Sequence, residues 1–401
     1  MLVNFSVNNY KSIKDTVDFS MIAGSSNTNN NTFTEGNLTL LPSSVIYGAN
    51  ASGKSNLLDA FSTMRRIVLN HDKIMLSADK LPYYPFKLST ETENCTTTFE
   101  AIFIEQGKRY KYGFEYARDE VYAEWLIVYE TSKPKVVFEY DKDFGYKPNS
   151  KIKEVRNLKQ LPNSLYLWKA DQGFCEYAND VIRWFNNCII ISQNKTDFMT
   201  DDYLDFIQKR EAKEIITKVL AAADIGIKGI NSINFESGKL NIKTLHQKYD
   251  DDNNPLNMSV FDFESEESLG TQKLFRMIEP IFVSLLRGSP LFIDEFDANL
   301  HPLIIKNLIV QLFHDLNIND KFSQLIFTTQ NTKFLDQSVL DRSQIWFADK
   351  DDYGVTKLTS LLEFKGIKRT DNIENGYLLG KYGATPDIGD FTSIKRRMQK
   401  N

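Results

Sequence analysis

Eight consecutive residues offer the clearest chemistry in the chain. The segment Gly48-Ala-Asn-Ala-Ser-Gly53-Lys54-Ser55 matches the pattern GxxxxGK[ST], whose glycines let backbone N–H groups curl round a phosphate. Lys54 is expected to reach the β- and γ-phosphates of a nucleotide, and the Ser55 hydroxyl to bind Mg²⁺. A glycine turn that only caps a helix is the alternative. We predict that the nucleotide contacts come from Gly48, Asn50, Ala51, Ser52, Gly53, Lys54, Ser55 and Asn56.

Two adjacent acidic residues follow a second apolar segment. The run Leu291-Phe-Ile is typical of a buried strand, and Asp294 and Glu295 come directly after it. We expect Asp294 to hold Mg²⁺ together with Ser55, and Glu295 to polarise the attacking water as a general base. Acidic pairs are also common in turns, so this interpretation depends on the phosphate-binding loop.

A serine and a glycine at the start of a predicted helix form a third element. Residues 267–272, Glu-Ser-Leu-Gly-Thr-Gln, resemble the signature of ABC ATPases. There a serine hydroxyl and a glycine backbone bind the γ-phosphate of ATP held by the other subunit. Ser268 and Gly270 would take these roles. The alternative is that Ser268 is only the N-cap of the helix that follows.

The residues after the acidic pair and after the next strand add two further candidates. Asp297 and the Leu300-His301-Pro302 turn resemble the D-loop of SMC, RecF and OLD ATPases, in which Asp297 would cross a dimer interface. His301 could equally be a helix-start residue. Gln330 stands where ABC ATPases hold a switch histidine, and glutamine donates a hydrogen bond but carries no proton. We expect slow hydrolysis with ATP binding as the working signal, unless Gln330 is an inconsequential strand-end residue.

Three further residues are candidates for nucleotide contacts because of their local sequence patterns alone. Gln193 follows the apolar run 188–192, as a Q-loop glutamine would, although an ordinary loop residue fits equally. Lys11 and Ser12 lie in a turn between two short strand patterns. That turn matches one near the nucleotide in SMC- and RecF-like heads, and a simple hairpin turn is the alternative.

The elements that must position these residues follow from periodicity. Two strands are expected within 1–23, a loop over 24–37, a helix over 56–70 and an antiparallel meander over 96–140. From 264 onward helices and buried strands alternate, which indicates a parallel sheet with helices on its faces. The expected helices are 201–223, 269–288 and 301–316, and the expected buried strands 188–192, 291–296, 324–330 and 344–350.

The predicted fold class is therefore α/β: a P-loop NTPase head of the ABC type, with a mixed sheet, an antiparallel β subdomain and an inserted arm of helices and strands. We expect residues 1–140 and 264–401 to form the two parts of the head and residues 141–263 to form the arm.

Composition limits the remaining classes. The chain has 401 residues, a net charge of −5 and three cysteines without CxxC spacing, which argues against a zinc site or a disulfide framework. No run approaches the ~20 apolar residues that cross a bilayer, and the first residues lack the pattern of a signal peptide. We expect a cytoplasmic protein without membrane contact.

Together these motifs resemble the bacterial ABC-type AAA ATPases related to RloA and the first AbiL component, with a head like those of SMC, RecF and OLD proteins. The resemblance covers residues 4–24, 48–56, 291–302 and the C-terminal 341–347, 360–364 and 376–386. It implies ATP and Mg²⁺ as ligands and an ATP-dependent homodimer or higher oligomer. It also implies control of a toxic effector with a Toprim-like nuclease fold in anti-phage defence. Gln330 departs from the usual histidine.

Two other functions stay open. A RecF- or SMC-like ATPase would act directly on DNA, but the chain is net acidic, has no long coiled coil, and its basic runs at 365–369 and 395–397 are short. Nucleic acid therefore stays a possible partner alongside a second copy of the chain and the effector protein. A solute-transporter ATPase would need a membrane partner, for which the sequence shows no coupling element.

Overall fold

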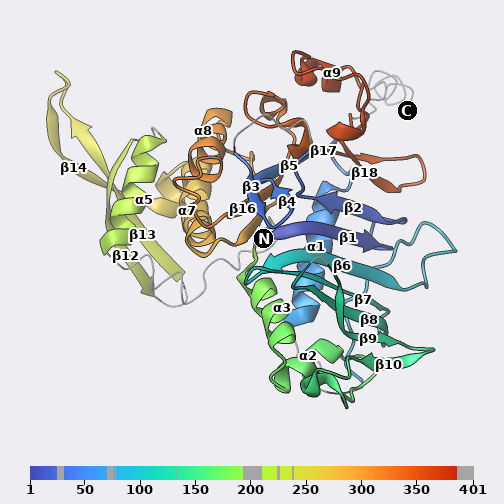
Figure 1. The fold of residues 1–401 in the computed structure, drawn as a ribbon. Coiled ribbons are helices and arrows are strands. Elements are labelled where there is room, and N and C mark those ends of the chain that lie inside the picture. The colour runs from blue at the N-terminus through green and yellow to red at the C-terminus, as the bar shows by residue number, and fades with distance from the viewer. Residues whose placement is uncertain are drawn as a thin grey trace, which may run out of the picture.

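The computed structural model describes residues 1–24, 31–69, 76, 78–131, 133–192, 210–223, 226–236 and 239–385. Two large sheets lie side by side with helices between and around them, and a small three-stranded sheet projects to one side (Figure 1). This mixed α/β architecture is consistent with a P-loop NTPase fold.

The first large sheet is antiparallel throughout and confirms the predicted meander. Its seven strands lie in the order β10-β9-β8-β7-β6-β1-β2. In β6 the side chains alternate between buried and half-buried positions, because one face covers the core and the other faces solvent. The strands are β1 Leu2–Asn8, β2 Val17–Ser20, β6 Thr97–Glu105, β7 Lys108–Tyr116, β8 Val121–Tyr129, β9 Lys135–Asp141 and β10 Gly145–Pro148.

The second large sheet carries the four strands predicted at 188–192, 291–296, 324–330 and 344–350, although the first of them lies at an edge and is only half-buried. Its order is β11-β15-β16-β5-β17-β18, parallel except for the antiparallel edge strand β18. Every residue of β5, β15 and β16 is buried, since helices cover both faces of such sheets. The strands are β5 Ser43–Tyr47, β11 Ile189–Ile191, β15 Pro290–Ile293, β16 Gln324–Thr329, β17 Ile345–Lys350 and β18 Thr356–Ser360.

Helices form the layers on either side of the parallel sheet. Between the two large sheets lie α1 Lys54–Leu69, α2 Tyr166–Gln172 and α3 Glu176–Asn187, and on the opposite face lie α7 Leu269–Arg287, α8 Pro302–Leu308 and α9 Ile373–Leu378. The predicted helix 301–316 is α8 followed by a π-helical turn, Ile309–Phe313. Short helical turns are α6 Phe263–Glu266, Lys153–Val155, Thr332–Phe334, Arg342–Gln344 and Leu361–Glu363.

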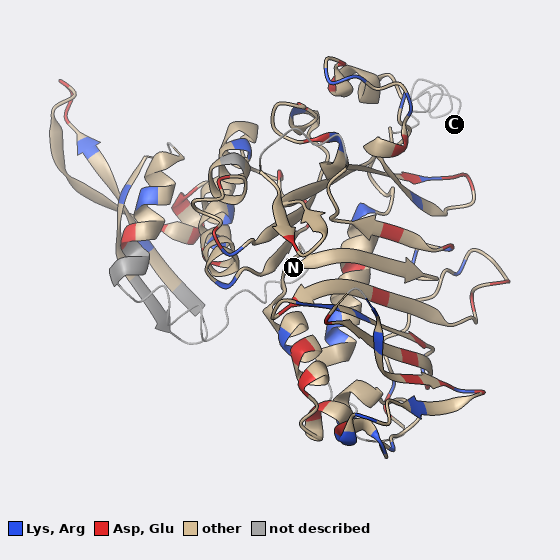
Figure 2. Ribbon diagram, in the orientation of Figure 1, with Lys and Arg blue, Asp and Glu red and all other residues tan. Residues whose placement is uncertain are grey.

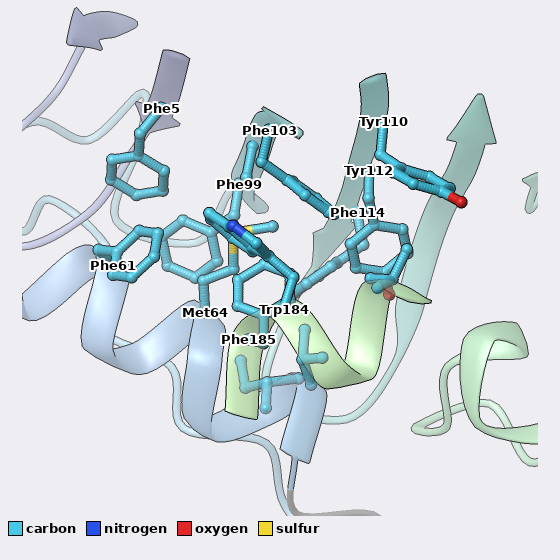
Figure 3. Packing of buried hydrophobic residues seen from close by; sticks show 14 of the residues in the cluster. Phe5, Phe61, Met64, Phe99, Phe103, Tyr110, Tyr112, Phe114, Trp184 and Phe185 are labelled. Atoms are coloured by element: carbon cyan, nitrogen blue, oxygen red, sulfur yellow. The ribbon is translucent and has the colours of Figure 1, made fainter. Parts of the chain in front are cut away.

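An aromatic core joins the two large sheets through α1. The ring of Phe61 stacks on Phe292 of the parallel sheet at 4.2 Å between centroids, and meets Phe5 of the antiparallel sheet edge-on at 5.2 Å. Trp184 of α3 also contacts Phe61 and stacks on Phe103 (Figure 3). Because α1 begins at the phosphate-binding loop, this core fixes the direction in which that loop faces.

The projecting unit consists of α5 Arg210–Ala222 packed on β12 Ile227–Glu236, β13 Lys239–Tyr249 and β14 Pro255–Asp262 (Figure 1). α5 is the described part of the predicted helix 201–223. Residues 141–192 instead add β10, α2, α3 and β11 to the layers of the head. We therefore propose 210–262 as the described extent of the arm, narrower than the predicted 141–263.

A second difference concerns the predicted loop 24–37. Two three-residue strands, β3 Phe33–Glu35 and β4 Leu38–Leu40, pair as a hairpin. Phe33 and Leu40 are buried in a small cluster with Val3 and Ile104. The loop prediction is wrong for this part, because two buried side chains hold a segment whose composition is that of a loop.

Candidate functional site

Three neighbouring strands of the parallel sheet end at one edge. β5 pairs with β16, and β16 pairs with β15, all in parallel. Their carboxyl ends therefore deliver the loop 48–53, the acids 294–295 and Gln330 to the same side of the sheet, which is where open α/β sheets bind ligands. Segments about 240 residues apart in sequence meet here, since the Ser55 hydroxyl donates a hydrogen bond to Asp294 across 239 positions.

Two positions of the loop 48–53 have no room for a side chain. Gly53 has φ +104°, and a Cβ on it would lie 2.1 Å from the Thr356 hydroxyl oxygen. A Cβ on Gly48 would lie 2.3 Å from the carbonyl oxygen of Ala348. Asn50, Ala51 and Ser55 are exposed at the mouth of the loop, whereas Ser52 and Lys54 are buried. The loop is thus a closely packed cradle with an open side.

Lys54 turns its ammonium group into this cradle. Its Nζ donates to the carbonyl oxygens of Gly48 at 2.6 Å and Ala49 at 2.8 Å. Burial lowers the pKa of Lys54, while the nearby carboxylates of Asp294, Glu295 and Asp297 oppose that shift. A buried cation at a helix N-terminus is a site for an anion such as phosphate.

The oxygen atoms beside the loop suit a magnesium ion. The Ser55 Oγ donates to Asp294 Oδ1 at 3.0 Å, and the Thr328 Oγ1 donates to the same oxygen at 2.6 Å. Mg²⁺ prefers hard oxygen ligands and commonly takes only one or two from the protein, with phosphates and waters completing the set. In the ranges that the structure describes, no group of three His, Cys, Asp or Glu could hold a metal. Because their oxygen atoms meet beside the phosphate-binding loop, Ser55 and Asp294 would hold Mg²⁺.

Glu295 sits on a backbone that two other side chains secure. Its φ is +49°, a left-handed conformation that is uncommon outside glycine. Its N–H donates to Thr328 Oγ1 at 2.7 Å, and its carbonyl oxygen accepts from Lys273 Nζ at 2.6 Å. Burial lowers the pKa of Lys273, opposed by Asp297 and the two acids. Sequence reasoning missed Thr328 and Lys273, although Lys273 directly follows the signature-like run 267–272.

The signature-like run lies against the turn after the acids. Ser268 is the N-cap of α7 and its hydroxyl accepts from the Thr271 N–H at 3.1 Å. This contact shows that Ser268 caps the helix, and its role toward a nucleotide stays a prediction. Ser268 is also exposed, as is the neighbouring Leu269 at 66%. A Cβ on Gly270 would lie 2.5 Å from the carbonyl oxygen of Asn299. The start of α7 therefore packs directly on the D-loop-like backbone.

The D-loop-like turn itself ends in a helix cap. Asp297 is half-buried, and its carbonyl oxygen accepts from the N–H of Leu300. The Nδ1 of His301 accepts from the N–H of Leu303 at 3.2 Å, which makes His301 the N-cap of α8. The helix-start alternative for His301 is thus the one that the structure shows.

A chain of hydrogen bonds ties the N-terminal turn to the phosphate-binding loop. The Asn56 amide donates to Ser12 Oγ at 2.6 Å, and the hydroxyls of Ser12 and Thr356 lie 2.7 Å apart. Thr356 Oγ1 in turn donates to the carbonyl oxygen of Ser52 at 2.8 Å. Lys11 instead pairs with Asp59 of α1 at 2.5 Å. Sequence reasoning missed Thr356, because a threonine at the start of an edge strand has no local signature.

The two glutamine candidates have different outcomes. Gln330 is exposed directly after the end of β16, at the same edge as the acids. The structure thus leaves the Gln330 side chain accessible to a ligand. Gln193 lies outside the described residues.

The chain matches a known protein family over most of its length. No helix in the described part of the chain is long and apolar enough to cross a membrane. A search of the curated proteins finds no match. Residues 43–336, which span the phosphate-binding loop, the acids and Gln330, match the family described as "AAA domain, putative AbiEii toxin, Type IV TA system". The match covers most of the chain, and the chain therefore belongs to this family of AAA-domain proteins, which is linked to abortive infection.

Proposed function

We propose that the chain is an ABC-type ATPase that binds Mg-ATP at residues 48–56 and closes into a dimer of two heads. The observation that carries the proposal is the hydrogen bond between Ser55 and Asp294. It places the hydroxyl that follows the phosphate-binding lysine beside the acid that follows a central strand, as nucleoside triphosphate hydrolysis with magnesium requires.

Each residue at this edge has a definite task in that reaction. The N–H groups of the loop and the ammonium of Lys54 bind the phosphates, and Ser55 with Asp294 would hold Mg²⁺, which neutralises phosphate charge when bound. The carboxylate of Glu295 orients the attacking water and accepts its proton. Gln330 donates a hydrogen bond toward the phosphate but takes no proton, so turnover is slow and the ATP-bound state is long-lived.

The exposed start of α7 supports a two-head arrangement. Ser268 and Leu269 face solvent, and so does Leu303 at 61% on the first turn of α8, next to the D-loop-like turn. Exposed apolar side chains beside a solvent-facing helix start suit a surface that closes on a second copy carrying ATP. Asp297 would lie at that interface.

The test measures solution mass of the Glu295→Gln variant by light scattering, with and without Mg-ATP. This variant keeps the shape of the side chain but lacks the base, so ATP should persist and the mass should increase on ATP addition. Ser268→Arg in the same background should bind ATP without the mass increase, and Lys54→Ala should bind no ATP. A mass that ATP leaves unchanged in Glu295→Gln, with ATP bound, would contradict the clamp.

We further propose that the ATP-bound dimer controls a toxic effector in phage defence, with a Toprim-like nuclease as the expected partner. The family description, which names a toxin–antitoxin system, supports a partner protein, and the Toprim-like nuclease rests on the resemblance of the sequence motifs. The test co-expresses a nuclease encoded by a neighbouring gene with Glu295→Gln in one strain and with Lys54→Ala in another, and measures nuclease activity in both. Control by ATP requires the two activities to differ.

A further inference from the structure

Five exposed basic side chains lie on the edge strand β10 and on the segment that follows it. The segment 147–159, which we name the basic loop, contains one acidic residue, Glu154, although the whole chain has a net charge of −5. It lies at the edge of the antiparallel sheet farthest from β2, near α2, where Figure 2 shows blue residues gathered at the bottom of the view. The five exposed cations are Lys147, Lys151, Lys153, Arg156 and Lys159.

The charges of the basic loop differ from those of its neighbours in their described ion pairs. Within the described ranges, no ion pair joins any of the five to an acid. Lysines on the adjoining strands behave differently, since each has a glutamate partner. These pairs are Lys108–Glu176, Lys111–Glu100, Lys135–Glu130 and Lys142–Glu120. The basic loop therefore presents positive charge without a described ion pair, on a sheet where several neighbouring lysines are paired and Arg109 instead lies over the Tyr129 ring.

The backbone of the basic loop is firmly held. Ile152 and Val155 are buried in the aromatic core, at 8% and 0% exposure, between the exposed cations. The Asn149 amide donates to the Val136 carbonyl of β9 at 2.6 Å, and the Tyr146 hydroxyl donates to the Val155 carbonyl at 2.8 Å. A surface fixed in this way loses little conformational entropy when it binds a partner.

An exposed aromatic ring accompanies these cations. Phe144, in the turn before β10, is 74% exposed, and the Lys147 ammonium lies 5.3 Å from its ring centroid. Cations in a row with an exposed aromatic ring are the elements with which proteins bind unpaired nucleotides: the cations contact phosphates and the ring stacks on a base. Acidic peptides and anionic lipids would use the cations but give the ring no base to stack on.

We propose that the basic loop is a binding surface for single-stranded nucleic acid, contacted through its phosphates and through a base stacked on Phe144. The proposal does not depend on the ATPase cycle, because the basic loop and the nucleotide site belong to different sheets. It predicts weak sequence preference and strong salt dependence.

The experiment measures anisotropy of a fluorescent single-stranded oligonucleotide of mixed sequence, titrated with the full chain at several salt concentrations. The loop variant is Lys151→Glu/Lys153→Glu/Arg156→Glu. Its matched control is Lys365→Glu/Lys368→Glu/Arg369→Glu, which makes the same charge change at three exposed positions. Circular dichroism and urea unfolding of both variants verify their folding.

We expect the loop variant to bind at least tenfold more weakly than the wild type, and its slope of log affinity against log salt to fall by about 2, since each lost phosphate contact removes about 0.7. The control should bind like the wild type. Phe144→Ala should weaken binding by about tenfold and leave the salt slope unchanged.

Three results would overturn the proposal. The first is equal loss of binding in the loop variant and the control, which would indicate unspecific attraction. The second is a wild type that shows no salt-sensitive binding of the oligonucleotide. The third is binding of phosphatidylserine-containing vesicles or poly-glutamate, but not the oligonucleotide, through the same three cations.

Discussion

Replacement of Gly270 by alanine tests how closely the start of α7 packs on the D-loop-like turn. In a solvent-exposed helix, where the new methyl group meets no other atoms, Gly→Ala stabilises a protein by up to about 1 kcal/mol. Here the new Cβ would lie 2.5 Å from the Asn299 carbonyl oxygen, so the turn must move by about 0.9 Å to reach an ordinary contact. Such overpacking costs about 1–3 kcal/mol. The two effects leave a net destabilisation of about 1 kcal/mol.

The effect on turnover should be much larger than the effect on stability. Asn299 follows Glu295 by four residues, and a misplacement of about 1 Å near a reacting centre can reduce a rate about 100-fold. We expect urea unfolding of Gly270→Ala to show the small loss and steady-state ATP hydrolysis to show the large one. Gly229→Ala in β12 is the control, because its Cβ would meet only the Leu245 side chain at 3.5 Å. A Gly270→Ala protein that is more stable than the wild type and hydrolyses ATP normally would refute the reasoning.

Three other substitutions have distinct readouts. Thr356→Val leaves the Ser52 carbonyl without its donor, so calorimetric ATP affinity should fall about tenfold; Thr356→Ser should restore it, and equal loss in both variants would contradict this. Gln330→His supplies a group that can carry a proton near neutral pH, and ATP turnover should rise; an unchanged rate would make position 330 silent. Burial lowers the pKa of His314 to about 4, below its ordinary 6.5. Between pH 4 and pH 6.5, His314 binds a proton in the unfolded chain but not in the folded one. The unfolding free energy should therefore fall by up to about 3 kcal/mol when the pH is lowered from 6.5 to 4. In urea titrations, His314→Gln should lose this part of the pH dependence; an unchanged pH profile would show that another group causes it.

The parts of the site that the sequence predicts are those with local patterns. Glycines, a lysine and a serine at fixed spacing after an apolar run indicate the loop 48–55, and a buried strand followed by two acids indicates 294–295. Both segments reach the same edge because parallel strands end together. The chain from Asn56 through Ser12 and Thr356 could not be predicted, since it joins residues up to 344 positions apart whose types are common on any surface.

Some elements depend on tertiary contacts in the same way. The strands β3 and β4 have three residues each and a loop-like composition, and the burial of Phe33 and Leu40 decides their conformation. The predicted helix 301–316 changes to a π turn, in which the His314 N–H reaches back to Ile309. The Nε2 of the His314 ring lies 2.7 Å from the Ser43 hydroxyl oxygen of β5. Helical periodicity in the sequence does not predict this contact.

The position of Phe61 between the two large sheets means that a nucleotide bound at one sheet should also stabilise the other. Because α1 packs on both sheets and also carries the phosphate-binding lysine, opening either sheet would displace the loop. A ligand held at the N-terminus of α1 should therefore slow amide hydrogen exchange in β6 and β7, which contribute nothing to the nucleotide site, as well as in β5 and β16. The antiparallel sheet and the parallel sheet would then exchange as one cooperative unit, with α1 as the element they share.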